Sequence, residues 1–478
     1  MSKVKFDFLN WQPDQEDYRN GGLITAENLI HAPEGYKQVK NFVTGGTGSY
    51  RTGLVHQVGD TGEFALLVAQ VTTTAGVFIG AYGAGGTGLS LPTGAGAATI
   101  LSLSSVEFND HIISCSTYSW TGGAGTTRAV NSSYITYPTA LPGASAYNGT
   151  WTVSAFPNSV GARVCGRVNN FVVVGNYDSG DTGDYSIRWS ALGDAEDWPI
   201  PGTADARTKQ AGEQVFDARY GDVTGIAGND FYAYVFQERA VTKMTYVGGD
   251  VVFTFDTFEE VRGCYQVGRF VQVDDAVYFE SRWNRHVALN GEIADIGFGI
   301  VDKTYPPVDD ESLRLEKNAA IHCVFFSNNL IYNYKTNQWT RAPNITARYS
   351  VENTEGIIGQ LYKDGSFIYR NTSSGGAAAT ATVVTGEFEL NPAGRAVVDG
   401  VRPLSDGASL SSVRIGVRNL LSDAVSYVTG SSVNSRSGMS HFRGGHPSGR
   451  YARGEFVFTG GFTTVTGADF EFYETGDT

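Results

Sequence analysis

The sequence contains a short motif, Asn169-Asn170-Phe171-Val172-Val173-Val174, in which two amide side chains precede a run of aromatic and β-branched residues. Asn and Asp tolerate left-handed backbone geometry and hydrogen-bond to their own backbone, so a pair of them can close a hairpin. The apolar run that follows is then the returning strand. The motif therefore predicts a β-hairpin centred on Asn169 and Asn170.

Copies of this motif recur along most of the chain, 35 to 60 residues apart, with a mean spacing of about 51. The other copies begin at Asn109-Asp110, Asn229-Asp230, Asp274-Asp275 and Asn328-Asn329, with weaker ones at Asp60-Thr61-Gly62-Glu63 and Lys363-Asp364-Gly365-Ser366. A repeat of about 40 to 50 residues is typical of a β-propeller, in which four-stranded blades pack side by side in a ring. We therefore expect an all-β propeller. One or more β-sandwiches with coincidental hairpin spacing are the alternative.

The segments outside the repeat predict three further regions. Residues 1–45 form an N-terminal arm poor in strands, because Trp11-Gln12-Pro13-Asp14 and Gly21-Gly22 interrupt any regular element. Residues 46–372 form the propeller, with inserted glycine-rich loops. Residues 373–380 are small and uncharged, as in a flexible linker. Residues 381–478 form a C-terminal domain rich in β-strands.

Composition limits the classes of function. The chain has 478 residues, with 49 acidic and 35 basic side chains, so its net charge is −14. This excess of negative charge argues against a surface that grips nucleic acid, which needs clustered Lys and Arg. No apolar run approaches the roughly 18 to 20 residues of a membrane helix, so no membrane span is expected. Polar residues follow Lys3 and Lys5 where a signal peptide would be apolar, and we expect no export signal.

No motif predicts a catalytic, cofactor or metal site. The glycines within Gly83–Gly88 fit a dinucleotide-binding pattern, but no helix follows them. The three aspartates within Asp178–Asp184 lack the alternating spacing of a calcium loop. Neighbouring acids such as Glu259-Glu260 point to opposite faces of a strand, whereas a glycosidase needs two facing carboxyl groups. We therefore expect no catalytic residue, no cofactor, no metal and no enzymatic activity.

Several stretches at both ends and in the middle of the chain resemble one family, the propeller-containing tail nozzle (tail tubular) proteins of short-tailed bacteriophages. The matching stretches are Trp11-Gln12-Pro13-Asp14-Gln15, Gly22–Asn28, Gly35-Tyr36, Ile187–Ser190, Asp197-Trp198, Gly221–Val223, Val235–Val241, Tyr246–Gly249, Gly416–Arg418, Ser437-Gly438 and Gly449–Arg453. Residues 70–160, which are rich in Gly, Ala, Ser and Thr, match no stretch of that family.

The resemblance implies a structural virion protein that closes the DNA channel below the portal and adaptor rings. It implies a closed, six-membered ring at the distal end of the tail, with the protein made in the host cytoplasm. The partners would be further copies of the chain, the adaptor (head-to-tail connector) protein and tail fibres or tailspikes. Genomic DNA would pass through an acidic lumen without sequence-specific binding.

Six residues are candidates for contacts with other subunits or the adaptor, because Arg and aromatic side chains are enriched at interfaces. They are Trp11, Asp14, Arg418, Arg450, Tyr451 and Arg453. The alternative function, from another class, is a tail-associated propeller that binds or depolymerises carbohydrate. That alternative predicts exposed Trp and Tyr side chains over a cleft with convergent carboxylates.

Overall fold

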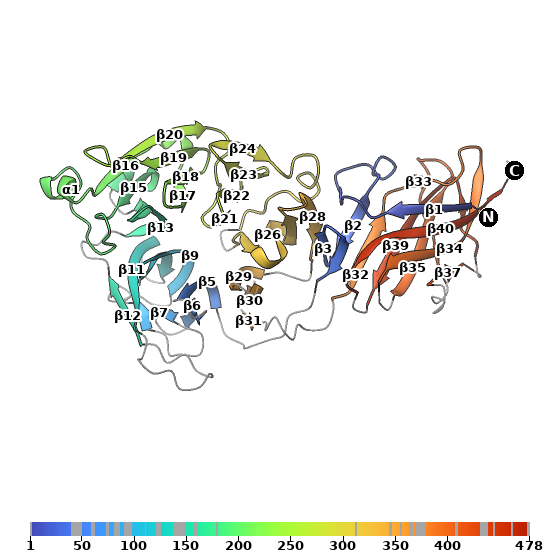
Figure 1. The fold of residues 1–478 in the computed structure, drawn as a ribbon, viewed down its shortest axis with the longest axis horizontal. Helices are drawn as coiled ribbons and strands as arrows, with labels where there is room; N and C mark the ends of the chain where they lie inside the picture. The colour runs from blue at the N-terminus through green and yellow to red at the C-terminus, as the bar shows by residue number, and fades with distance from the viewer. Residues whose placement is uncertain are drawn as a thin grey trace.

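The computed structural model describes most of the chain. The described residues are 2–39, 50–58, 63–72, 76–80, 87–89, 98–109, 111–120, 126–136, 150–155, 161–177, 180–310, 313–343, 347–353, 356–362, 367–369, 379–406, 410–430, 438–442, 445–459 and 462–475. The predicted all-β class with a propeller and additional strand-rich terminal segments is confirmed (Figure 1).

Seven consecutive antiparallel sheets, numbered here as blades 1 to 7, make up the propeller formed by these residues. Blades 1 to 3 comprise β5 (Tyr50–Val58), β6 (Glu63–Thr72), β7 (Gly76–Gly80), β8 (Thr87–Leu89); β9 (Ala98–Phe108), β10 (His111–Trp120), β11 (Thr126–Thr136), β12 (Thr150–Ala155); and β13 (Ala162–Val168), β14 (Phe171–Tyr177), β15 (Ser186–Trp189), β16 (Gly212–Val215). Blades 4 and 5 comprise β17 (Val223–Gly228), β18 (Tyr232–Gln237), β19 (Val241–Tyr246), β20 (Phe253–Glu259); and β21 (Phe270–Val273), β22 (Ala276–Glu280), β23 (Arg285–Leu289), β24 (Glu292–Asp295). Blades 6 and 7 comprise β25 (Glu316–Asn318), β26 (Cys323–Phe326), β27 (Leu330–Asn333), β28 (Gln338–Arg341); and β29 (Ala347–Asn353), β30 (Gly356–Tyr362), β31 (Phe367–Tyr369).

The first strand of each blade contacts the first strand of the next, and β29 of blade 7 contacts β5 of blade 1, so the ring closes. Short helical segments lie in the connections: α1 (Ala204–Thr208), η1 (Gly180–Tyr185), η2 (Ala218–Tyr220), η3 (Ala319–Ile321) and η4 (Ser327–Asn329). No helix of the described residues is long and apolar enough to cross a membrane.

The predicted hairpins are present, with one difference in their position. Asn109, Asn169 and Asp274 each have positive φ in the turn between the first and second strands of a blade. Asn328-Asn329 instead turns between the second and third strands of blade 6. The repeat therefore mixes two kinds of turn, because any tight hairpin favours Asn in left-handed geometry. Residues 59–62 and 363–366, which hold the two weaker copies, lie outside the described residues.

A β-sandwich adjoins the propeller and is built from strands of both ends of the chain. Its strands are β1 (Ser2–Asp7), β2 (Leu23–Glu27), β3 (Leu29–Ala32), β4 (Gly35–Gln38), β32 (Ala381–Thr385), β33 (Phe388–Glu389), β34 (Arg395–Ser405), β35 (Leu410–Arg418), β36 (Ser426–Thr429), β37 (Ser440–His441), β38 (Ser448–Gly449), β39 (Tyr451–Phe458) and β40 (Val465–Thr475). Side chains alternate between buried and half-buried along β39, which is typical of a strand with one face on a core. The rings of Phe456 on β39 and Phe470 on β40 meet across the two sheets, 6.4 Å apart.

The N-terminal segment differs from the expected strand-poor arm. Residues 2–38 contribute four strands to the sandwich, and β1 pairs along its whole length with β40. These pairings join residues more than 400 positions apart, which local turn signals do not reveal. The predicted linker at 373–380 is described only at Ala379 and Thr380, whose carbonyls accept hydrogen bonds from Gln38 and Asn28.

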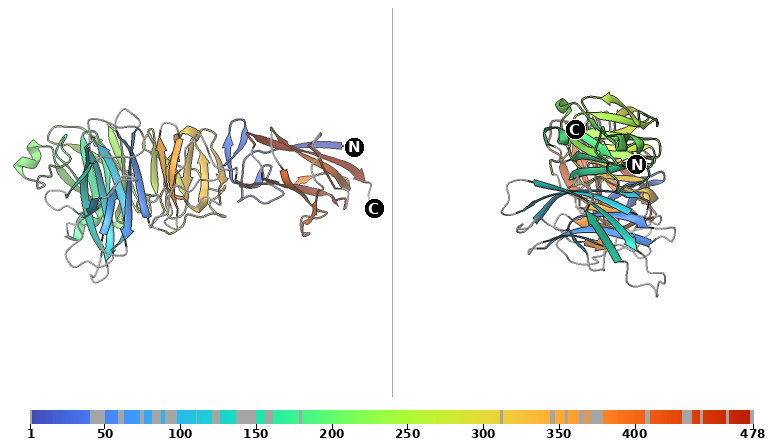
Figure 2. Two further views of the ribbon diagram at one scale, coloured as in Figure 1. Left: turned by 90° about the horizontal axis from the view of Figure 1, so that it is seen from below. Right: turned by 90° about the vertical axis from the view of Figure 1, so that its left-hand side faces the viewer.

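One sheet runs from the propeller into the sandwich. Its strand order is β25-β26-β27-β28-β2-β32-β39-β35-β36, so blade 6 continues through β2 into the C-terminal strands. Glu27 on β2 and Arg341 on β28 pair in parallel register and form an ion pair of 3.0 Å. The Asn28 backbone N–H donates to the Arg341 carbonyl. We call this junction the β2–β28 seam, and it lies between the two halves of the elongated molecule (Figure 2).

A single hydrophobic core crosses the seam. It includes Val324 and Trp339 of blade 6, Trp11 of the N-terminal segment, and Val398 and Phe456 of the sandwich. Because these side chains pack in one continuous cluster, the propeller and sandwich are held by burial of apolar surface as well as by strand pairing.

Candidate functional site

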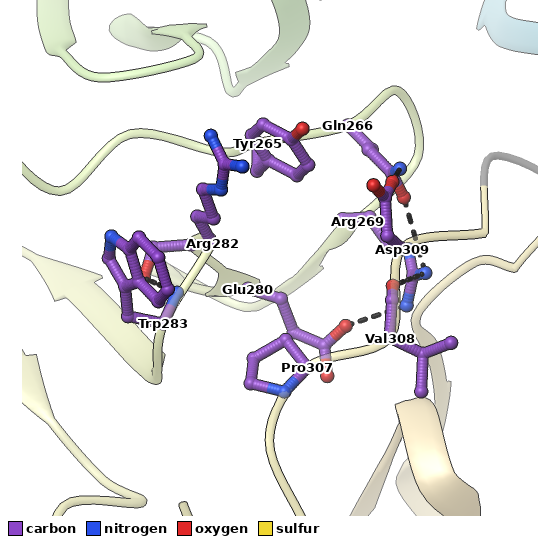
Figure 3. A pocket seen from close by; sticks show the side chains of 10 residues that line it. Tyr265, Gln266, Arg269, Glu280, Arg282, Trp283, Pro307, Val308 and Asp309 are labelled. Atoms are coloured by element: carbon purple, nitrogen blue, oxygen red, sulfur yellow. Dashed lines mark hydrogen bonds and ion pairs between the residues drawn. The ribbon is translucent and has the colours of Figure 1, made fainter.

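A pocket opens on the propeller where blades 5 and 6 meet. Its lining comes from three chain segments: the connection before β21, the β22–β23 turn, and the connection before β25. It has a volume of about 230 Å³ and is lined by Tyr265, Gln266, Arg269, Glu280, Ser281, Arg282, Trp283, Pro307, Val308 and Asp309 (Figure 3). We call it the Trp283 pocket.

The base of the pocket is a buried charge cluster centred on Glu280. One carboxylate oxygen accepts from Arg269 Nη1 at 2.7 Å, and the other accepts from Arg285 Nε at 3.1 Å. The backbone N–H and hydroxyl of Ser327 also donate to that second oxygen. Both arginines and Glu280 are almost fully buried. With its oxygens already bound to two guanidinium groups, Glu280 holds blades 5 and 6 together and is not free to transfer protons to a ligand.

Arg269 also organises the rear wall. Its Nη2 donates to the carbonyls of Val308 and Asp310, at 2.7 and 3.0 Å, and so fixes the connection that leads to β25. Its Nε is buried and has no hydrogen-bond partner among the described residues. A buried donor without a partner costs free energy unless a ligand or water satisfies it.

The rim carries an exposed aromatic side chain and a cation. Trp283 is 76 % exposed. The Arg282 guanidinium carbon lies 5.2 Å from the Tyr265 ring centroid and 5.3 Å from the Trp283 ring centroid. Such distances are typical of cation–π contacts. Sequence reasoning missed this site. The only clue in the sequence was the Arg282-Trp283 pair in a tight turn. The three segments that line the pocket come together only after folding.

Below the rim, Ser281, His286 and Asp295 are connected in the order of a nucleophilic triad. Ser281 Oγ lies 2.8 Å from His286 Nε2, and His286 Nδ1 lies 2.5 Å from Asp295 Oδ1. However, Ser281 Oγ also accepts from the backbone N–H groups of Trp283 and Asn284. These bonds occupy the lone pairs that a nucleophile would use, so the network shapes the turn that presents Trp283.

Two carboxyl groups lie on the neighbouring blade. Burial, and then the charge of Asp222, raise the pKa of Glu238 above its usual value, while nearby arginines including Arg282 oppose this. The backbone N–H of Glu238 donates to the Asp222 carbonyl at 3.1 Å. A carboxylic acid with a raised pKa beside a carboxylate is suited to proton donation.

Four of the six predicted interface residues lie together on the sandwich. Arg418 on β35 is in register with Tyr451 on β39, and Arg453 is two residues further along β39. Each arginine is paired within the chain: Arg418 with Glu387, Arg450 with Glu389, and Arg453 with Asp17. Arg414 and Arg453 both lie over the Tyr427 ring. We call this group, Arg414, Arg418, Tyr427, Arg450, Tyr451 and Arg453, the Arg–Tyr face.

The other two predicted interface residues lie at the junction with the propeller. Trp11 is 1 % exposed and donates from Nε1 to the Ile24 carbonyl, so it offers no surface to another subunit. Asp14 accepts from the backbone N–H groups of Lys303 and Thr304. Burial raises the pKa of Asp14, but these hydrogen bonds outweigh burial and hold the pKa below its usual value.

No family model and no curated protein matches the sequence. Among solved structures, an exo-β-1,3-galactanase from Phanerochaete chrysosporium with galactose is similar at 9 % identity and a TM-score of 0.30, over 91 % of this chain and 100 % of that one. A mutant of the GH43 protein BlXynB from Bacillus licheniformis is similar at 10 % identity and a TM-score of 0.23, over 98 % of this chain and 99 % of that one.

These matches correct one expectation. The expected absence of enzymatic activity is wrong as an exclusion, because the similar structures are glycoside hydrolases. With TM-scores below 0.5, the matches assign no activity, substrate or catalytic residue to this chain.

Proposed function

We propose that the chain is a structural subunit of a phage tail nozzle, assembled as a closed ring through which DNA passes. The observation that carries this proposal is the β2–β28 seam, where one sheet and one core join propeller and sandwich. The wall of a channel must keep its shape while DNA passes through it. The propeller and the sandwich therefore need to behave as one rigid body. The motifs at both ends and in the middle of the sequence, which resemble the nozzle family, support the same function.

The Arg–Tyr face is the proposed subunit contact. It combines side chains that are enriched at protein interfaces, on the half-buried side of β39 that faces away from the core. The arginines are paired within the chain, so a partner would meet a pre-organised surface whose charges are already balanced. A head-to-tail contact of this kind closes into a ring when its rotation divides a full turn.

The first experiment measures particle mass and shape by light scattering and negative-stain imaging, with and without an adaptor ring. The proposal predicts hollow rings near six times 51.3 kDa. An Arg450→Ala, Arg453→Ala double variant should lower the fraction of rings. The matched control is Arg19→Ala, because Arg19 also lies over a tyrosine ring but on the N-terminal segment. A chain that remains monomeric on the adaptor, or a double variant that assembles normally, would contradict the proposal.

A second candidate function is a carbohydrate-directed propeller, and the Trp283 pocket favours it. The pocket combines exposed Trp283 with Tyr265 and with the Asp309 carboxylate, and the acids Glu238 and Asp222 lie on the neighbouring blade. The expected function called for exposed Trp and Tyr side chains over a cleft with convergent carboxylates; the pocket supplies the exposed Trp and one exposed carboxylate, and Glu238 and Asp222 lie outside its lining. Incubation with host-surface polysaccharides, followed by reducing-sugar and binding assays, tests it.

A further inference from the structure

We infer that the Trp283 pocket binds a carboxylated sugar, of the hexuronate class, within an acidic polysaccharide. This inference rests on the second candidate function and names its ligand class; it does not depend on the nozzle proposal. Three features carry it: an exposed aromatic platform, an exposed arginine on the rim, and a carboxylate oxygen placed to accept from a hydroxyl group.

The platform is Trp283. Its indole is 76 % exposed at the edge of a concave site, where an aromatic face offers apolar surface to the C–H groups of a sugar ring. The Ser281–His286–Asp295 network and the two backbone donors to Ser281 hold the turn in one conformation. The platform is therefore fixed before a ligand arrives, which lowers the entropic cost of binding.

The positive charge offered to a ligand is that of Arg282, because Arg269 is already paired with Glu280 in the base of the pocket. Glu280 is the counter-ion of both Arg269 and Arg285, so two buried cations share one carboxylate. Arg282 is exposed and makes no ion pair or hydrogen bond with the described residues. It is close enough to Glu238 for its charge to lower the pKa of that carboxyl group. The buried Nε of Arg269 is likewise unpaired among the described residues. In a chain of net charge −14, an exposed guanidinium group without an ion pair among the described residues favours a carboxylate on the ligand.

The acceptor is a carboxylate oxygen of Asp309, on the connection before β25. Gln266 Nε2 donates to Asp309 Oδ1, which leaves the second carboxylate oxygen of exposed Asp309 without a bond to the described residues. A carboxylate in this position accepts hydrogen bonds from sugar hydroxyls. The volume of about 230 Å³ is below the roughly 300 to 1,000 Å³ of typical drug-sized sites, so it suits a single sugar ring whose polymer continues into solvent.

The test uses the full chain and two matched polymers, polygalacturonate and its methyl-esterified form, which have the same sugar ring with and without the charge. Calorimetric titration should show tighter binding of polygalacturonate. Trp283→Ala should weaken binding of both polymers about tenfold or more, because loss of an aromatic contact worth about 1.4 kcal/mol has that effect. Arg282→Gln should abolish the preference for the acid while retaining binding of the ester.

Two control variants lie outside the pocket. Phe231→Ala removes an equally exposed aromatic ring from the turn between β17 and β18, and Arg19→Gln removes an exposed arginine that lies over Tyr18. Both should bind as the unaltered chain does. Equal affinity for acid and ester, or an unchanged Arg282→Gln variant, would overturn the acidic ligand class. Failure of both polymers to bind would overturn the pocket as a polysaccharide site, whereas normal ring assembly in the same sample would leave the nozzle proposal standing.

Discussion

Glu280 lies between two buried guanidinium groups and compensates both. Glu280→Gln should destabilise the fold by roughly 3–5 kcal/mol, because removing one partner leaves buried charge without a counter-ion. Scanning calorimetry should show a lower melting temperature. The control is Glu389→Gln, which removes an exposed pair with Arg450 and should cost less than about 1 kcal/mol. Equal shifts in the two variants would contradict this role of Glu280.

His286 makes stability depend on pH. Burial lowers its pKa below the usual 6.5, with Asp295 opposing the shift. The unfolded chain therefore binds a proton more readily than the folded chain does, so this contribution to stability is present above about pH 6.5 and is lost as the pH falls below it. Melting temperatures measured from about pH 8 to pH 5 should fall, and more shallowly for His286→Gln. Parallel profiles for the two proteins would refute the assignment.

At the scale of the elements, the hairpin turns were the part of the fold that sequence could predict. Asn169 has φ of 50°, and its side chain donates to the Asp230 carbonyl of the next blade. Asn169→Val should lower the free energy of unfolding by about 1–2 kcal/mol more than Asn169→Gly does, because left-handed geometry penalises a β-branched residue and not glycine. Urea unfolding measures the difference. Asn170→Val, without positive φ, is the control, and similar midpoints for the two Asn169 variants would contradict the explanation.

The N-terminal strands and the pocket escaped prediction for a physical reason. Turn residues act on their immediate neighbours, so Asn and Asp pairs report hairpins wherever these occur in a blade, as at Asn328-Asn329. Strands β1, β2 and β4 pair instead with segments hundreds of residues away, and the glycines around them suggest breaks in an arm. The Trp283 pocket is assembled from three separate segments, whereas Arg450, Tyr451 and Arg453 of the Arg–Tyr face are neighbours in sequence and could be grouped from it; Arg414 and Tyr427 join them only after folding.

The β2–β28 seam depends on a few groups. Arg341 pairs with Glu27, lies 4.7 Å from the Tyr305 ring centroid and donates to the Asn328 carbonyl. Arg341→Ala should accelerate hydrogen–deuterium exchange in Leu23–Glu27 and in Gln338–Arg341, since local opening becomes easier when such contacts are lost. Arg414→Ala, which removes a comparable pair with Glu455, should leave these peptides unchanged. Unchanged exchange in Arg341→Ala would contradict this role of the Arg341 side chain and leave the backbone pairing and the core to hold the seam.

For the whole molecule, both ends of the chain are needed to complete the sandwich. Removal of residues 1–38 deletes four strands and the Trp11 side chain from the shared core. We expect the truncated chain to aggregate, because the apolar faces of β32, β39 and β40 would be uncovered. Its C-terminal strands should be cleaved faster in limited proteolysis, and circular dichroism should show less β-strand. Removal of Ser2–Asp7 alone takes away only one strand and should be tolerated. A soluble, folded 39–478 fragment would contradict this dependence.

Because strands from both ends of the chain form the sandwich, the order of synthesis on the ribosome determines which domain can fold first. About 340 residues separate Gln38 from Ala379, which at roughly 5–20 residues per second takes about 20 to 70 s to translate. Throughout that interval the strands β1 to β4 have emerged but their C-terminal partners have not. Phe6, Phe8 and Leu23 must wait uncovered while the blades form one after another. The propeller can thus fold before the sandwich, which is completed last. A chaperone that binds the nascent N-terminal segment would need to stay bound for this whole interval.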